Sequence, residues 1–569
     1  MPEYDEPLDP QQIAAVEATD ARIAVLAGPG SGKTRTLSYR ARHLLQLNAD
    51  ARTLLLTFTN KAAAEMKFRA LGVAAIESGR IQASTFHTFG MRTLRAHGRA
   101  VGIEPDFELI DSEEQKEFAR ETLGSDTGLE GWSRARIRLL SPSSRVADVG
   151  EAYEAAKREA NVVDFDDLVV YAAELFAENE TVARAYGTRF PHLLVDEFQD
   201  TNPAQFAIVQ ALAPHAETVS VFADDDQAIF AWAGAETTNI RRFVAELGAR
   251  EFPLTVNYRC RDEIVFRAND LIAAEPTASG RQMTPDKEDG EVTVRVFTDV
   301  EEEAEAIADD IERAIDAQEV RPSDICVLTR NATRAARILP TLLDRGLPAQ
   351  RWMGSGFDAA ERRTAATCMS VVRGRLNDRQ ASRLCQLLDI EQTEERRTRE
   401  LLTGLGEHPT AAALLEVNTL AASGATPLAV MRQVRAAVAL ARPELKAFAD
   451  DLVETVVAFE QHDPEFTLEH LLADLMLGGT GGAPTEGGGI KVATIHRTKG
   501  LQWPWVYLVG LEEGWLPDWH AKTDEEISEE RKLCFVGVCR AEDRLVLSRI
   551  HTYKGYRQPP SRFLDEMKL

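Results

Sequence analysis

Cysteine is scarce in this chain of 569 residues, which contains only six. None of them forms a Cys-x-x-Cys pair, so a zinc or iron–sulfur site is not expected and the thiols are expected to be reduced. Long apolar runs are also missing, since no stretch reaches the roughly 20 apolar residues of a membrane-spanning helix. The acidic N-terminus lacks the apolar core of a signal peptide. We therefore expect a cytoplasmic protein with no membrane partner.

Positive charge is the second shortage. Lysine is rare, and 91 acidic against 65 basic side chains give a formal net charge of −26. Taken alone, this balance argues against a nucleic-acid-binding protein. It does not exclude one, because binding needs only a local basic groove. The length and the ordinary apolar fraction of 44% predict several globular domains.

The most informative stretch begins with a short apolar run at residues 23–26, which predicts a buried parallel strand. A glycine-rich loop follows, and residues 36–45 predict a helix. In such a strand–loop–helix the loop N–H groups and the helix N-terminus bind a pyrophosphate. Lys33 is expected to reach the β- and γ-phosphates, and Thr34 to hold Mg²⁺. The nucleotide-binding residues expected here are Ala27, Gly28, Gly30, Ser31, Gly32, Lys33, Thr34 and Arg35.

Carboxylates follow the predicted strand at residues 190–195. Asp196 ends this strand beside the phosphate loop, a position that suits Mg²⁺ binding directly or through water. Glu197 is placed to polarise or deprotonate the attacking water. After the next predicted strand, residues 218–222, Gln227 follows three aspartates and can reach a γ-phosphate.

Other segments combine polar groups with aromatic rings. The N-terminus of a predicted helix at Thr59, Asn60 and Lys61 suits a phosphate of a nucleic-acid strand. The group Thr85, Phe86 and His87 suits stacking on single-stranded bases. Either segment is equally consistent with an ordinary strand–helix junction.

Two further pairs of residues, each with at least one aromatic ring, follow along the chain. Phe230 and Trp232 alternate with small residues, a spacing that suits base stacking. Tyr258 and Arg259 offer a ring for a base and a guanidinium for a phosphate.

Two regions interrupt this pattern of strands and motifs. Residues 100–163 are polar, helical in pattern and without a strand signal, which predicts an inserted helical subdomain. Residues 377–486 are again helical in pattern and end in glycine clusters typical of a flexible linker. Strand-like segments at 291–297, 324–329 and 490–494 flank the second region.

The order of these motifs resembles the superfamily 1 helicases of the UvrD/Rep/PcrA group. The resemblance covers nearly the whole chain, from Gln12 to Phe563. The matching segments are Gln12, Ala-Gly-Pro-Gly-Ser-Gly-Lys-Thr, Thr-Phe-Thr-Asn-Lys-Ala-Ala, Ser-Thr-Phe-His-Thr, Asp-Glu-Phe-Gln-Asp, Asp-Asp-Asp-Gln-Ala-Ile-Phe, Asn-Tyr-Arg, His-Arg-Thr-Lys-Gly-Leu-Gln-Trp and the segment that ends in Cys-Arg-Ala.

The resemblance implies an α/β fold of two RecA-like, parallel-sheet P-loop domains, each with an inserted α-helical subdomain. Domain 1A would comprise residues 1–99 and 164–274, interrupted by the helical insert 1B at 100–163. Domain 2A would comprise 275–376 and 487–569, interrupted by insert 2B at 377–486, which is shorter than usual.

The resemblance also implies an ATP-dependent DNA helicase that moves 3′→5′ on single-stranded DNA and unwinds duplexes in repair, replication or recombination. Its cofactors would be ATP and Mg²⁺, and its partners single-stranded DNA and single-strand/duplex junctions; the sequence does not identify a protein partner. The implied catalytic residues are Lys33, Glu197, Gln227, Arg259 and the arginine finger Arg540. Further ATP contacts would come from Gln12, which can read adenine, from Tyr258 and from Gln502, at the ribose. The implied DNA contacts are Thr59, Asn60, Lys61, Thr85, Phe86, His87, Phe230, Trp232 and His496.

The chain departs from the family pattern at several positions. Gln502 replaces a glutamate, Cys539 replaces a hydroxyl residue, and Ala233 replaces the arginine of Trp-Arg-Gly. None of these changes removes a catalytic group. Two alternatives stay open: a translocase that strips proteins from DNA without efficient unwinding, favoured by the short second insert, and a DNA-binding scaffold without turnover, favoured by Ala233 and Gln502.

Overall fold

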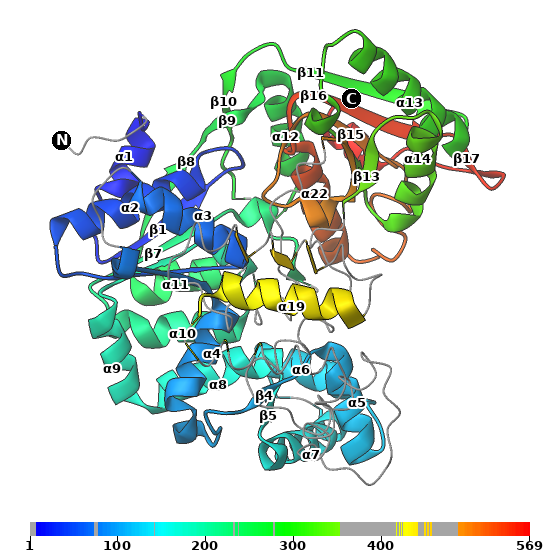
Figure 1. The fold of residues 1–569 in the computed structure, drawn as a ribbon. Helices are drawn as coiled ribbons and strands as arrows, with labels where there is room; N and C mark the ends of the chain where they lie inside the picture. Colours follow the sequence, from blue (N-terminus) through cyan, green and yellow to red (C-terminus); the bar gives the residue numbers. More distant parts are fainter. Residues whose placement is uncertain are drawn as a thin grey trace.

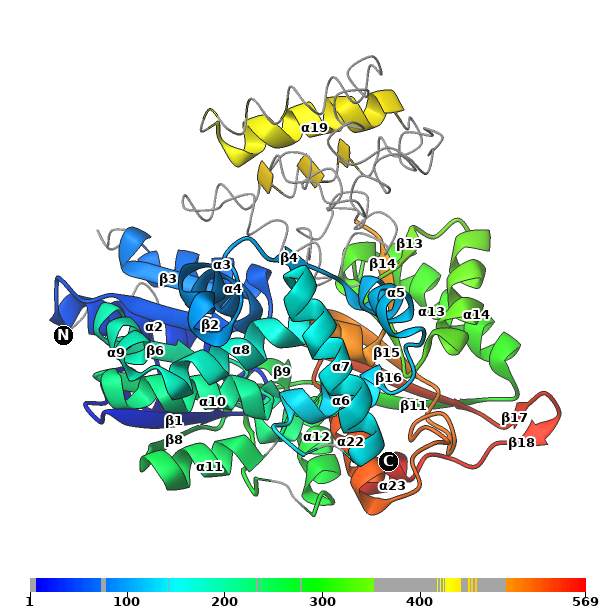
Figure 2. The same cartoon turned by 90° about the horizontal axis from the view of Figure 1, so that it is seen from below.

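The computed structural model describes residues 7–352 apart from 73–77, 142, 232–233, 237 and 277–278, parts of 417–457, and residues 488–569. Most of the expected insert 2B therefore lies outside the described residues, and so do Trp232 and Ala233 of the first lobe. Two lobes, each built on a six-stranded sheet, lie side by side (Figure 1). The described part of insert 2B includes helix α19 (Pro427–Ala441), which lies apart from both sheets (Figure 2).

The first sheet has the strand order β3-β2-β6-β7-β1-β8, and every pairing is parallel. Its strands are β1 (Arg22–Ala27), β2 (Thr53–Thr57), β3 (Ile81–Thr85), β6 (His192–Val195), β7 (Thr218–Ala223) and β8 (Arg250–Leu254). The helices of this lobe are α1 (Pro10–Val16), α2 (Lys33–Leu47), α3 (Asn60–Leu71), α4 (Phe86–His97), α8 (Phe165–Glu178), α9 (Glu180–Arg189), α10 (Pro203–Leu212) and α11 (Thr238–Leu247).

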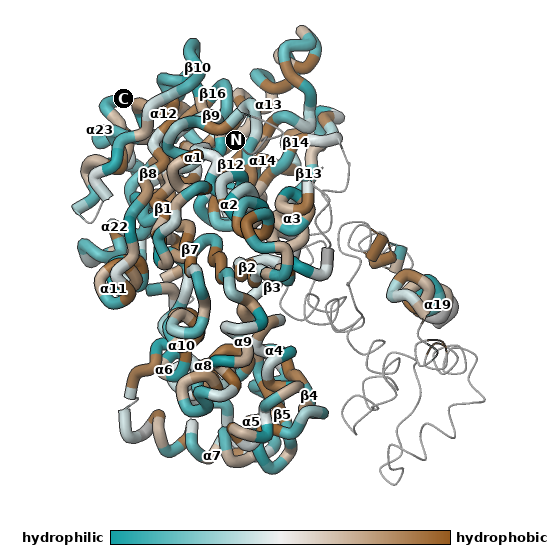
Figure 3. The backbone as a smooth tube through the Cα atoms, turned by 90° about the vertical axis from the view of Figure 1, so that its left-hand side faces the viewer, coloured by the Kyte–Doolittle hydropathy of each residue, from teal (hydrophilic) through white to brown (hydrophobic). Residues whose placement is uncertain are grey.

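Helices cover both faces of this sheet, so its central strands are buried on both sides. In β1, Ala24 and Leu26 enter one hydrophobic core, while Ile23 and Val25 enter another. Apolar stretches accordingly run along β1 and β7 through the interior (Figure 3). This double burial explains why the sequence shows unbroken apolar runs here instead of alternation.

Insert 1B is mainly helical, with α5 (Ser112–Leu123), α6 (Leu129–Ile137) and α7 (Ser144–Ala160). It also contains two strands, β4 (Glu108–Leu109) and β5 (Val162–Val163), which pair in parallel. Our expectation of no strand in this region was wrong, because two-residue strands leave no periodic signal. Buried charges attach the insert to α8: the Nζ atom of Lys157 lies 2.6 Å from carboxylate oxygens of both Asp164 and Asp167.

The second sheet has the order β11-β16-β15-β12-β14-β13 and is also parallel throughout. Its strands are β11 (Glu291–Phe297), β12 (Ile325–Thr329), β13 (Ala349–Arg351), β14 (Ile490–Thr494), β15 (Trp503–Val509) and β16 (Ala541–Ile550). The helices of this lobe include α13 (Val300–Asp316), α14 (Ala332–Asp344), α22 (Asp524–Val538) and α23 (Arg562–Glu566), and a hairpin of β17 (Thr552–Tyr553) and β18 (Tyr556–Arg557) projects from it. The predicted fold class of two parallel-sheet α/β lobes is confirmed.

None of the described helices is both long and apolar enough to cross a bilayer.

Strand β9 (Val256–Arg261) and helix α12 (Asp262–Ala273) connect the lobes. Strand β9 pairs with β10 (Thr284–Lys287). Cys260 of β9 and Ile264 of α12 pack in the second-lobe core with Cys539. The sequence predicts that domain 1A extends to residue 274. Because this segment packs in the second-lobe core, we propose a boundary near residue 255.

Candidate active site

The phosphate loop joins β1 to α2 and requires glycine at two positions. Gly30 and Gly32 have φ angles of 69° and 75°, a region that other residues rarely adopt. A Cβ atom at Gly30 would lie 2.6 Å from Cβ of Arg259, and one at Gly32 would lie 2.6 Å from Nε2 of Gln12. The loop therefore passes directly between Gln12 and strand β9.

Lys33 begins α2 and pairs with the two carboxylates that follow β6. Its Nζ atom lies 2.6 Å from Oε1 of Glu197 and 3.6 Å from Oδ1 of Asp196. Burial acts to lower the pKa of Lys33, but the attraction of Glu197 and Asp196 outweighs it and raises that pKa above its usual range. The ammonium group is therefore charged at neutral pH and lies where a phosphate competes with the carboxylates for it.

The two carboxylates differ in pKa. Burial raises the pKa of Asp196 to about 6. Burial also acts to raise the pKa of Glu197, but Lys33 and then Lys499 outweigh it and lower that pKa to about 2. Glu197 has a left-handed backbone with a φ angle of 50°, which is strained for a residue with a side chain. Glu197 is thus held as an ionised group, as a base or water-orienting residue must be.

Gln12 supports the phosphate loop from the side of α1. Its side chain is 1% exposed, Nε2 donates to the carbonyl of Ser31 at 2.9 Å, and Oε1 accepts from the N–H of Asp9 at 3.2 Å. Through these contacts the amide of Gln12 braces the phosphate loop, and its contact with adenine stays a prediction. Tyr258 reaches the same corner, donating its hydroxyl to Asp9 at 2.6 Å and its N–H to the carbonyl of Gly30 at 2.9 Å.

Arg540 reaches the first lobe from the turn after α22. It is 1% exposed, and its Nη2 donates to Oε1 of Gln227 at 3.0 Å. Its Nη1 donates to the carbonyl of Leu501 at 2.8 Å. Burial and then the neighbouring Arg259 lower the pKa of Arg540 to about 10, which still leaves it charged at neutral pH. Since Gln227 follows β7, this hydrogen bond joins the two lobes beside the predicted γ-phosphate position.

Arg259 is the second arginine at the cleft and lies on β9. Its Nε donates to Oε1 of Gln502 at 2.6 Å, and its Nη1 donates to the carbonyl of Cys539 at 3.2 Å. The glutamine that replaces the expected glutamate therefore holds Arg259 through a neutral oxygen. The structure brings Arg259, Gln502 and Arg540 together.

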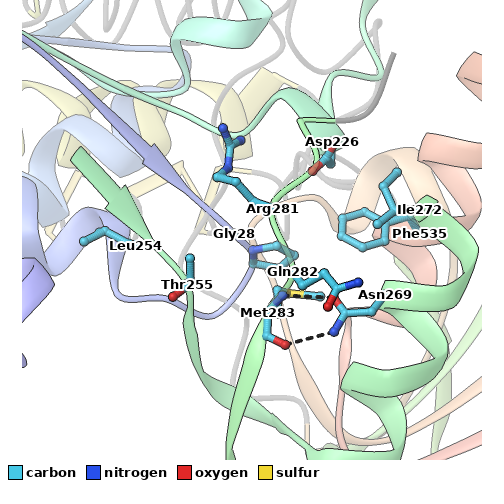
Figure 4. A pocket seen from close by; sticks show the side chains of 11 residues that line it. Gly28, Asp226, Leu254, Thr255, Asn269, Ile272, Arg281, Gln282, Met283 and Phe535 are labelled. Carbon is cyan, nitrogen blue, oxygen red and sulfur yellow. Dashed lines mark hydrogen bonds between the residues drawn. The ribbon is translucent and has the colours of Figure 1, made fainter. Parts of the chain in front are cut away.

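A small cavity lies behind the phosphate loop, between the lobes (Figure 4). Gly28 contributes from the loop and Phe535 from α22. Asn269 closes it by donating to the carbonyl of Met283 at 2.9 Å and accepting from the N–H of Met283 at 3.0 Å. Its volume of about 10 Å³ has room for about one water molecule. It is too small to be the nucleotide site.

The expected DNA contacts fall on both surface and core. Phe230 stacks on Phe58, with ring centroids 6.0 Å apart and an interplanar angle of 10°. Phe58 is 37% exposed, so this pair offers a ring surface to a base. Phe86 is 1% exposed and lies in the first-lobe core, which removes it as a base-stacking residue. Thr85 is also buried, and its hydroxyl caps α4 by accepting from the N–H of Thr88 at 3.1 Å.

The remaining expected DNA contacts are mostly polar. Burial lowers the pKa of His87 to about 4, and burial with Arg330 lowers that of His496 to about 4, so neither histidine supplies positive charge at neutral pH. The hydroxyl of Thr59 caps α3 by accepting from the N–H of Ala62 at 3.1 Å. The side chains of Asn60 and Lys61, like Trp232, lie outside the described residues.

Three residues at this site were missed by sequence reasoning: Phe58, Asp200 and Lys499. Each lies inside a motif that we recognised, namely Thr-Phe-Thr-Asn, Asp-Glu-Phe-Gln-Asp and His-Arg-Thr-Lys-Gly. Their membership of a motif was the available signal. Their contacts join residues far apart in the chain, which motif spacing does not reveal.

The fold and the site define a two-lobed P-loop nucleoside triphosphatase. Residues 8–247 match the family model of the UvrD/REP helicase N-terminal domain, and residues 252–394 and 432–552 match that of the UvrD-like helicase C-terminal domain. The chain belongs to the UvrD-like helicases and is an ATP-dependent DNA helicase of this type.

Individual relatives agree with this family assignment. DNA helicase II of Salmonella typhimurium is 30% identical, over 98% of this chain and 87% of that protein. DNA helicase II of Escherichia coli is 29% identical over the same shares. The ATP-dependent DNA helicase PcrA of Leuconostoc citreum is 28% identical, over 98% of this chain and 84% of that protein.

Proposed function

We propose that this helicase moves along single-stranded DNA in the 3′→5′ direction and separates strands at single-strand/duplex junctions, in DNA repair, replication or recombination. The observation that carries the proposal is the contact between Gln227 of the first lobe and Arg540 of the second, beside Lys33. A γ-phosphate bound there would interact with Lys33 of the first lobe and with Arg540 of the second. Nucleotide binding and hydrolysis would thereby change how the lobes sit against each other. The polarity rests on the family resemblance.

The residues at the ATP site have distinct proposed roles. Lys33 exchanges Glu197 for the β- and γ-phosphates, and Glu197 is then free to orient or deprotonate the attacking water. Arg259 and Arg540 supply positive charge to the transferring phosphoryl group from the side of the second lobe. Asp196 and the hydroxyl of Thr34 are hard oxygen donors that fit Mg²⁺. Asp196 is buried, and its Oδ1 lies 3.6 Å from Nζ of Lys33, which is longer than a direct hydrogen bond. Bound Mg²⁺ would neutralise charge on the phosphates.

The proposed DNA path crosses the stacked pair of Phe58 and Phe230. The N-terminus of α3, which directly follows Phe58, is suited to a backbone phosphate. Ring stacking and helix dipoles need no overall positive charge, which reconciles DNA binding with the net charge of −26.

A strand-separation assay tests the proposal. A fluorescent duplex with a single-stranded 3′ tail, a second with a 5′ tail and a blunt duplex are incubated with ATP and Mg²⁺. We expect separation of the 3′-tailed duplex only, and none with Lys33→Ala. Separation of the 5′-tailed duplex alone would refute the polarity. ATP turnover on single-stranded DNA without separation would support the protein-stripping translocase instead, and no DNA-stimulated turnover would support the scaffold.

A further inference from the structure

Lys499 belongs to the second lobe but contacts the first lobe at three points. Its Nζ atom lies 2.5 Å from Oδ2 of Asp200 and donates to the carbonyl of Gln227 at 2.6 Å. It also lies 5.0 Å from the centre of the Phe230 ring. The side chain is 10% exposed and that of Asp200 is 2% exposed, so this is a desolvated junction of the lobes rather than a surface ion pair.

Each of these contacts leads to a different part of the proposed machinery. Asp200 is joined to the catalytic carboxylate through Gln199, whose Nε2 lies 2.5 Å from Oε2 of Glu197 and 3.4 Å from Oδ2 of Asp200. The side chain of Gln227 accepts the hydrogen bond of Arg540.

The third contact leads toward DNA. The Phe230 ring below the ammonium stacks on the exposed ring of Phe58. The ammonium of Lys499 thus contacts Gln227 and Phe230 directly and reaches Glu197 through Asp200 and Gln199. We call the stacked rings of Phe58 and Phe230 the stacking platform.

The positive charge of Lys499 stabilises the buried carboxylate of Asp200. Burial raises the pKa of Asp200 to about 6, and Lys499 opposes that rise. The other oxygen of Asp200, Oδ1, is buried and has no hydrogen-bond partner in the described part of the chain. Removing Lys499 would leave this carboxylate with only the weak contact to Gln199, which is costly for a buried charge. An ammonium can also serve a carboxylate, a carbonyl and a ring face at once, because its three donors surround one atom.

We propose that Lys499 is a positioning residue that couples the nucleotide site to the grip on single-stranded DNA. The proposal rests on the proposed function and goes further, because it names the group that links the two sites. When the lobes move relative to each other, Lys499 moves with the second lobe. Its bonds then displace the backbone of Gln227 and the ring of Phe230 together. The stacking platform therefore differs between nucleotide states.

The test measures the affinity for a fluorescent oligothymidine with a non-hydrolysable ATP analogue and, separately, with ADP. The ratio of the two dissociation constants is the coupling, which for linked sites is typically about 5–150-fold. Lys499→Met keeps the length of the side chain but removes its charge. Lys522→Met, at an exposed position of the same lobe, is the matched control for loss of one positive charge. We expect the ratio to fall to within about twofold of unity for Lys499→Met and to stay at the wild-type value for Lys522→Met.

Other outcomes would overturn the proposal. If Lys499→Met weakens DNA binding equally in both nucleotide states, Lys499 is a simple DNA contact; if the ratio is unchanged, it has no coupling role. Should Lys499→Met fail to fold, the isosteric Asp200→Asn variant tests the same junction, and an unchanged ratio there also refutes the coupling. A wild-type protein with a ratio of one would instead refute the proposed function, which keeps the two failures distinguishable.

Discussion

Replacement of Arg540 by lysine is the sharpest test of how the lobes cooperate in hydrolysis. The guanidinium donates from three different nitrogens, to the carbonyls of Val536 and Leu501 and to the side chain of Gln227. A lysine keeps the positive charge, but its donors lie on one atom and cannot reach three separated acceptors. We therefore expect the charge to remain near the γ-phosphate while its placement is lost.

The magnitude follows from these contacts. An arginine finger contributes roughly 10³–10⁵-fold to the rate of phosphoryl transfer. Since lysine retains the charge, we expect a fall in kcat of roughly 10²–10³-fold, equal to about 3–4 kcal/mol of barrier. Loss of two hydrogen bonds from a charged donor should also lower the free energy of unfolding by about 3 kcal/mol or more. The KM for ATP should change little, because Lys33 and the phosphate loop are intact.

The assay is steady-state phosphate release at saturating single-stranded DNA, with thermal unfolding measured in parallel. Arg544→Lys is the matched control, because Arg544 is a mostly buried arginine of the same lobe that pairs with Glu291 at 3.2 Å, away from the cleft. We expect its kcat to stay within about twofold of the wild type. A kcat of Arg540→Lys within tenfold of the wild type would refute the role of Arg540 at the transition state.

Three further predictions follow from the site and its surroundings. Glu197→Gln should lower kcat by roughly 10²–10⁴-fold and tighten ATP binding, because Lys33 loses its 2.6 Å carboxylate partner; weaker ATP binding in equilibrium titration would contradict this. Phe230→Leu should weaken the binding of single-stranded DNA by about 1–3 kcal/mol in fluorescence titration, whereas Phe243→Leu, in the core, should lower stability without a specific loss of DNA affinity. Burial raises the pKa of Glu512 to about 7 from 4.5, with Arg334 opposing. The folded state therefore binds more protons between these values, and the free energy of unfolding should fall by about 3 kcal/mol as pH rises through this window. Glu512→Gln should flatten the slope in denaturation measured at several pH values, and an unchanged slope would refute this assignment.

Local sequence patterns predicted strands in both lobes and the phosphate loop of the first. The apolar run at residues 23–26 and the glycines after it correspond to β1 and the phosphate loop, and the strand predicted at 490–494 has the same bounds as β14. Burial on both faces produces such runs, and glycine is required where φ is positive, so both signals have direct physical causes.

Long-range packing limited the rest of the prediction. Phe86 and Phe230 both lie in aromatic motifs, yet only Phe230 joins the stacked surface, because α4 turns Phe86 into the core. Lys499 and Asp200 are 299 residues apart in the sequence, and their contact depends on how the two lobes pack against each other. No local pattern records such an approach, since it depends on tertiary packing.

Strand β9 places consecutive side chains against opposite lobes. Tyr258 is bonded to Asp9 of the first lobe, whereas Arg259 is bonded to Gln502 of the second. Successive residues of a strand point in opposite directions, so a single-residue deletion at residue 256 would exchange the two orientations at once. A substitution in this segment can therefore change one contact at a time. An insertion or deletion of an odd number of residues would instead reverse the directions of all the side chains beyond it.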